Sequence, residues 1–303
     1  MAAITLAALF FVVVDTYAPC PWGATSCAHP VSFRCEPARP HRLFREPWNV
    51  VSNLAFWAVA LCVPHRPPPP APPAPSTSSP WRLVSTALAA TTAALGTASG
   101  WYHACQCMAA ALADLTLLVF LLGLVGLATV GAALVVANWV PSSPIRVHGT
   151  TAVAVGTMGY AAYWLPRTGW SSNTAFFAAG AAVLGTTAVF GTWTTARCGG
   201  GVGVGVGGVG VGDDGRTLAW RLWARTVAST LVAVAAWMPE DVFDVCVAGG
   251  ILHAVWHVAA AMALAYHGWW WTHVLALTAT QRQPLPGPTT PTTLGPPDSR
   301  EVP

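Results

Sequence analysis

Three histidines in apolar segments have the spacing of a metal site. His253 and His257 are four residues apart, and His103 closes a separate apolar segment. Residues four apart on a helix lie on one face, about 5 to 6 Å from each other, so this pair can present two imidazoles to one ion. With His103 they supply three nitrogen ligands and leave a fourth position for water, as in catalytic zinc sites.

Ser99 and Asp114 are two further polar residues in the apolar segments near these histidines. Ser99 precedes His103 by four residues, which puts its hydroxyl beside the third imidazole on a helix. Asp114 stands near the start of the following apolar segment. A zinc ion among these groups would lower the pKa of its water toward about 7 and polarise a substrate carbonyl. Taken singly, each residue is also explained by packing, but together they predict a metal site. Four other histidines are isolated near loops or segment ends, and we interpret them as bystanders: His65, His148, His267 and His273.

The composition indicates a lipid environment. Hydrophobic residues make up 54% of the 303-residue chain and charged residues only 8%, whereas soluble domains carry about a quarter charged residues. The formal net charge is only +3, which argues against the clustered basic surface of a nucleic-acid-binding protein. The chain has too few polar groups to solvate a compact soluble particle.

The elements that must position the polar residues are seven apolar segments, each long enough to cross a bilayer as a helix. They cover residues 48–64, 81–103, 108–138, 147–165, 172–194, 217–237 and 246–270. The third segment is kept as one helix because no charge or strong turn signal interrupts it. The predicted fold class is all-α: an integral membrane bundle of seven transmembrane helices with an intramembrane metal site.

The distribution of arginine predicts the orientation of these helices. The chain contains no lysine, and five arginines fall in short loops on one side of the membrane: Arg66, Arg82, Arg146, Arg197 and Arg216. The loops between helices on the other side carry Arg167 alone. The positive-inside rule therefore places the N-terminus outside and the C-terminus in the cytosol. With seven spans, His103, Asp114 and His253 then lie at one depth, near the outer face.

Composition also divides the chain into regions. Residues 1–18 form a short apolar run that is typical of a signal peptide, with an uncleaved anchor as the alternative. Residues 19–45 are predicted to be a cysteine-containing lumenal leader, and residues 46–274 are the membrane domain. Residues 275–303 are rich in proline and threonine, which favours a disordered cytosolic tail.

The leader contains Cys20, Cys27 and Cys35, which indicates disulfide bonds in an oxidising compartment. Because three is an odd number, at least one of these cysteines stays free or pairs elsewhere, for example with Cys105 or Cys107. A zinc knuckle formed with the neighbouring histidines is the alternative, but the leader lacks a close Cys-x-x-Cys pair.

Four short motifs occur in order along residues 45–268. They are Glu-Pro-Trp-Asn-Val-Val-Ser-Asn at 46–53, Ser99-x-x-x-His103 followed by Asp114, an acidic turn at 237–243 that contains Asp241, and His253-x-x-x-His257. In type, order and spacing these motifs resemble the alkaline ceramidase family. That family belongs to a wider superfamily of seven-helix hydrolases, which includes the adiponectin and progestin receptors and a lipid-remodelling protein of GPI anchors.

The resemblance implies a zinc-dependent intramembrane amidase that hydrolyses ceramide, its lipid partner, to a sphingoid base and a fatty acid. It implies His103, His253 and His257 as the zinc ligands. It also implies that Asp114 orients or deprotonates the zinc-bound water and that Ser99 steadies the site or the developing oxyanion. A multi-pass protein of the endoplasmic reticulum or Golgi membrane is expected.

One departure from the family pattern concerns calcium. Animal members have an Asp-Trp-x-Glu-x-Asn cluster that binds Ca²⁺ together with the glutamate that matches Glu46. This chain has Cys20-Pro-Trp22 instead, without those carboxylates. A role for Ca²⁺ is therefore doubtful, and Glu46 is expected to pair with a nearby arginine or to cap the first helix.

Two alternatives to ceramide hydrolysis come from the same superfamily. The cysteine-bearing leader also suits a hydrolase that remodels GPI lipids or other lipids. The other alternative is a receptor-like seven-helix protein with a structural zinc, but the sequence outside the membrane is too short for a large ligand-binding domain.

Overall fold

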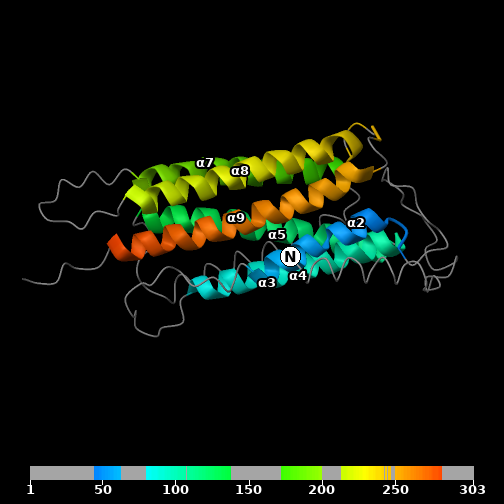
Figure 1. The fold of residues 1–303 in the computed structure, drawn as a ribbon, viewed down its shortest axis with the longest axis horizontal. Helices are drawn as coiled ribbons and strands as arrows, with labels where there is room; N and C mark the ends of the chain where they lie inside the picture. Colours follow the sequence, from blue (N-terminus) through cyan, green and yellow to red (C-terminus); the bar gives the residue numbers. More distant parts are fainter. Residues whose placement is uncertain are drawn as a thin grey trace, which may run out of the picture.

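The computed structural model describes residues 44–62, 80–106, 108–137, 172–199, 213–241, 243, 245–246 and 250–281, and its regular structure over these residues is entirely helical. The many alanines and leucines of these segments favour helices. The helices lie side by side along one long axis (Figure 1). They are α2 (Pro47–Ser52), α3 (Leu54–Cys62), α4 (Pro80–Cys105), α5 (Met108–Val136), α7 (Ser172–Gly199), α8 (Asp213–Asp241) and α9 (Ile251–Gln281).

Most of the predicted segments match these helices. The first predicted segment forms two pieces, α2 and α3, which meet at Asn53. The prediction that segment 108–138 is a single helix is confirmed, because α5 runs without a break to Val136. The predicted helix at 147–165, the signal peptide, the leader up to residue 43 and the tail from residue 282 lie outside the described residues. The first part of the predicted disordered tail, residues 275–281, is helical and belongs to α9.

The start of the last helix was predicted wrongly. We expected it at residue 246, but α9 begins at Ile251 and extends to Gln281, beyond the predicted domain boundary at 274. Gly250 has a φ of 87°, a left-handed conformation that an α-helix does not contain. The late start puts His253 in the first turn of α9, at the end of the bundle.

The cysteines also depart from one expectation. Cys105 is buried and is not disulfide-bonded, so its suggested disulfide with the leader is wrong. Cys62 and Cys198 are not disulfide-bonded either. Cys246 is disulfide-bonded, and it lies just before α9 begins. The three leader cysteines and Cys107 are outside the described residues.

Helix α9 has the central position in the bundle. It packs against α2, α3, α5, α7 and α8, and α4 packs against α2, α3 and α5. In Figure 1, α2, the end of α4 and the start of α9 lie at the same end of the molecule. Side chains from these three elements can therefore meet at that end.

Aromatic side chains pack tightly near the opposite end. Trp223 of α8 lies against Trp270 of α9, with 4.9 Å between the ring centroids. Gly191 of α7 makes room for Trp223, since a Cβ atom at Gly191 would lie 2.1 Å from that indole ring. The indole N–H groups donate to threonine hydroxyls of α7, from Trp223 to Thr192 at 3.1 Å and from Trp270 to Thr195 at 2.9 Å. This end is held by apolar packing, and the indole N–H groups of Trp223 and Trp270 are paired.

One described stretch, Ala109–Val136 of α5, is long and apolar enough to cross a membrane. The other long helices contain more alanine, glycine and threonine, and α8 also carries arginines, which lowers their hydropathy. A single such helix also occurs in the cores of soluble proteins, so the seven-span bundle stays a prediction.

Candidate metal centre

Three imidazoles converge where α4 ends and α9 begins. His103 lies in the last turn of α4, and His253 and His257 lie in successive turns at the start of α9. The side-chain nitrogens of the three residues lie within 4.8 Å of one another. Each residue is at most 1% exposed. The convergence that the sequence predicts is therefore present, and the group could hold a metal ion.

The donor set fits a zinc ion. Zinc accepts imidazole nitrogens at about 2.0 to 2.1 Å, and three such ligands form the protein part of a catalytic site. The side-chain nitrogens of all three residues are close enough together to be ligands of one ion.

Glu46 holds His103 in place, and the expectation that it caps the first helix was wrong. It stands at the N-cap of α2, but its side chain makes no capping hydrogen bond. Instead, its Oε2 atom lies 2.5 Å from Nδ1 of His103. The carboxylate is fully buried and also accepts hydrogen bonds from Asn49 at 3.1 Å and Gln106 at 2.5 Å. A carboxylate behind a metal-binding histidine fixes the orientation of its ring and raises its basicity.

The backbone at the end of α4 supports this contact. Gln106 has a φ of 54°, the left-handed conformation that commonly ends a helix. The carbonyls of His103 and Ala104 accept hydrogen bonds from the backbone N–H groups of Glu46 and Arg45 at 3.1 and 3.2 Å. These bonds satisfy carbonyls that a helix end leaves without an internal partner. They also join the segment before α2 to the last turn of α4.

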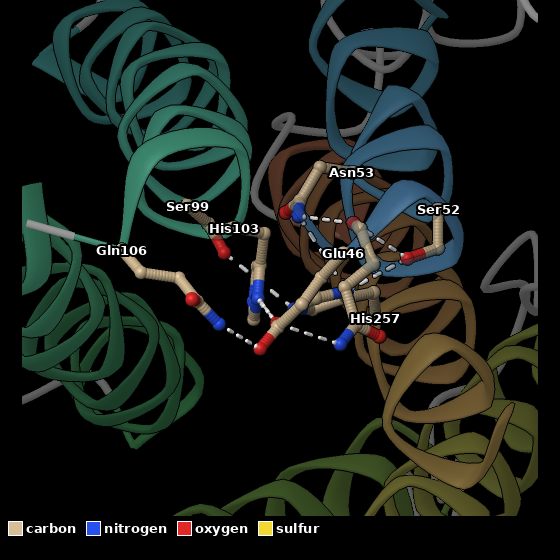
Figure 2. Close-up of polar contacts among 8 residues, drawn as sticks. Glu46, Ser52, Asn53, Ser99, His103, Gln106 and His257 are labelled. Carbon is tan, nitrogen blue, oxygen red and sulfur yellow. Dashed lines mark hydrogen bonds and ion pairs between the residues drawn. The ribbon is translucent and has the colours of Figure 1, made fainter. Parts of the chain in front are cut away.

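His257 is oriented by α2. Ser52 donates its hydroxyl proton to the carbonyl of Asn49 at 2.9 Å, and its oxygen lies 2.8 Å from Nδ1 of His257. Because a serine hydroxyl has one proton, this oxygen accepts from Nδ1–H of His257. That tautomer leaves the lone pair of Nε2 for a metal. Figure 2 shows Glu46 and Ser52 reaching from α2 toward the two imidazoles.

Ser99 lies beside the histidine cluster; we expected its hydroxyl next to His103, and it lies close to His257. It is 2% exposed, and its hydroxyl is 3.5 Å from Nε2 of His257. Asp114 is half-buried in α5. Its carboxylate is not part of the group of ligand atoms within 4.8 Å, which in the described part of the chain consists of the three histidines. Its predicted role beside the bound water stays a prediction.

Two histidines that we interpreted as bystanders have structural partners. His267 is buried and its Nε2 atom lies 2.9 Å from the hydroxyl of Thr129 in α5. His273 lies 2.8 Å from the carbonyl of Gly215 in α8. Both connect α9 to a neighbouring helix. Their partners are far away in sequence, so spacing alone could not identify them.

An apolar cavity of about 360 Å³ adjoins the cluster. Phe56 and Trp256 line the cavity and also contact the histidines: Phe56 is 6.1 Å from His257 between ring centroids, and Trp256 is 4.9 Å from His253. The rest of the lining is mainly leucine, alanine and valine from α4, α5, α7, α8 and α9. The histidine cluster thus lies beside a space suited to a hydrocarbon chain.

Comparisons of the chain with protein-family models, with curated proteins and with solved structures found no match.

Proposed function

We propose that the protein is a zinc-dependent intramembrane amidase that hydrolyses ceramide to a sphingoid base and a fatty acid. The observation that carries the proposal is a buried three-histidine cluster beside an apolar cavity. Lipid amides combine a polar reacting bond with long hydrocarbon chains, so they match this combination. The motif resemblance to the alkaline ceramidases supports the choice of ceramide.

The chain's own residues have distinct roles in this proposal. When bound, zinc supplies a water of lowered pKa and polarises the amide carbonyl. Glu46 and Ser52 hold two imidazoles with their Nε2 atoms toward the ion. Asp114 takes the proton from the attacking water and returns it to the amide nitrogen as the carbon–nitrogen bond breaks. Ser99, close to Nε2 of His257, donates to the oxygen on which negative charge develops.

We also propose that the protein is a multi-pass membrane protein with the metal centre near the lumenal face. Many large apolar side chains on the outside of the helices are exposed, which is unusual for a soluble monomer. They include Trp57, Leu61, Val189, Phe190, Trp193, Leu231, Val232 and Met262. The disulfide of Cys246 supports an oxidising compartment at the histidine end, such as the lumen of the endoplasmic reticulum or Golgi.

Turnover by purified protein in lipid nanodiscs tests this function. We expect release of a fatty acid from ceramide, loss of activity on chelation, and recovery with added Zn²⁺. Ester lipids and GPI lipids of matched chain length serve as comparison substrates. Cleavage of these lipids without cleavage of ceramide would replace the proposal with a lipid-remodelling hydrolase. Tight zinc binding without turnover of any lipid would instead indicate a receptor-like protein.

A further inference from the structure

The apolar cavity contains a group of polar side chains away from the metal centre. Thr187 of α7, Thr226 and Thr230 of α8 and His267 of α9 all belong to its lining. His267 follows His257 by ten positions in α9, which corresponds to about 15 Å along the helix axis. The cavity is therefore polar at a point far from the cluster of His103, His253 and His257, although its remaining walls are hydrocarbon.

Thr187 is the most informative member of this group. It is 7% exposed, and its hydroxyl has no hydrogen-bond partner among the described residues. Leaving a buried hydroxyl unpaired costs free energy, and native proteins contain few such groups. Threonines in helices commonly donate to the carbonyl four residues earlier, as Thr226 and Thr230 do here. Thr187 makes no such bond, so its hydroxyl proton is available to a group in the cavity.

The neighbouring polar groups supply acceptors. Thr226 and Thr230 donate their protons to the carbonyls of Leu222 and Thr226, so their oxygens remain able to accept. Thr129 donates to the carbonyl of Val125, so it accepts from Nε2–H of His267. In that tautomer Nδ1 of His267 is also an acceptor. One donor among several acceptors is complementary to a hydroxyl group, which both accepts and donates.

We propose that this end of the cavity binds a hydroxyl group on the acyl chain of the substrate, remote from the amide. The inference rests on the proposed function, because it assigns the cavity to the acyl chain of a lipid amide. The preferred substrates are then amides of hydroxylated fatty acids whose hydroxyl lies about 15 Å from the carbonyl. An unsubstituted chain leaves Thr187 unpaired, and a hydroxyl close to the amide does not reach it.

Fatty acid binding tests the inference without any need for turnover. Purified protein in nanodiscs is loaded with a pyrene-labelled fatty acid, which is displaced by unsubstituted, α-hydroxy and ω-hydroxy fatty acids over a series of chain lengths. We expect one range of lengths in which the ω-hydroxy acid binds about 2- to 10-fold tighter than its unsubstituted counterpart, as one net hydrogen bond provides. The α-hydroxy acids should show no such preference.

Two variants locate the effect. Thr187→Val keeps the branched shape without the hydroxyl, and it should remove or reverse the preference for the ω-hydroxy acid. Thr186→Val is the matched control, since Thr186 is the exposed neighbour on the same helix, and it should keep the preference. Equal affinity for ω-hydroxy and unsubstituted acids at every length in the wild-type protein would overturn the inference. So would an unchanged preference in Thr187→Val.

The ligand comparison in the wild-type protein remains decisive if Thr187→Val does not fold. Parallel turnover of unsubstituted ceramide separates this inference from the proposed function. If the protein hydrolyses ceramide but shows no preference for ω-hydroxy acids, the inference about the cavity is wrong and the proposed function stands. A preference for the ω-hydroxy acid without turnover of any amide removes the proposed amidase alone, and the cavity is then a binding site for hydroxylated fatty acids.

Discussion

The two ends of the helix bundle are built on opposite principles. At one end, buried histidines, Glu46 and Ser52 form a polar network within the helices. At the other end, Trp223 and Trp270 pack against small residues such as Gly191 and pair their few polar atoms locally. Buried polar groups are costly unless they are paired, whereas apolar packing stabilises directly. We therefore propose that the histidine end serves function and that the tryptophan end serves stability.

The largest expected effect is at the histidine end. His253→Ala should abolish metal binding and reduce amide hydrolysis to background, because two imidazoles on separate helices do not replace a three-ligand site. The protein should still fold, since the tryptophan end is untouched. Metal analysis and a ceramide turnover assay measure both effects. His273→Ala is the control on the same helix and should retain the metal; equal metal content in both variants would remove the site.

Asp114→Asn should separate chemistry from metal binding. The amide keeps the approximate shape of the carboxylate but cannot act as a base, so turnover should fall by about 10²- to 10⁴-fold. Metal content should remain that of the wild-type protein. A variant that loses its zinc would show instead that Asp114 is a ligand.

Glu46→Gln tests the support behind His103. Groups that hold metal ligands typically contribute 10- to 100-fold in affinity, and we expect a loss of about this size in zinc affinity. Ser52→Ala should cost less, because its bond to His257 is between neutral groups and charge-assisted bonds are about twice as strong. Competition with a chelating dye gives both affinities. An affinity unchanged in Glu46→Gln would mean that the glutamate does not support the metal centre.

The smallest effect on activity is expected at the tryptophan end. Gly191→Ala puts a methyl group against Trp223, and overpacking of this kind costs about 1 to 3 kcal/mol of unfolding free energy. Zinc content and turnover per folded molecule should be unchanged. Gly185→Ala on the same helix is the control, because a Cβ atom there meets nothing within 4 Å. Thermal unfolding in detergent should distinguish the two variants, and equal stability would contradict the assigned role of Gly191.

The sequence predicted the helices well because long apolar runs leave little choice of structure. It also predicted the meeting of His103, His253 and His257, since helix spacing and an alternating chain direction bring them to one end. The start of α9 was missed because periodicity does not report the left-handed conformation of Gly250. The role of Glu46 was missed because its partner His103 is 57 residues away. The stretch 46–53 did carry a signal, namely several polar residues at the entrance to an apolar helix.

X-ray absorption at the zinc edge tests the central claim most directly, since it reports the atoms bound to the metal in the purified protein. The three-histidine site predicts nitrogen or oxygen neighbours at about 2.0 to 2.1 Å, with the multiple-scattering pattern of imidazole rings. This pattern should disappear together with the metal in His253→Ala. Sulfur neighbours at about 2.3 Å would place the zinc on cysteines, and they would contradict the site described for His103, His253 and His257.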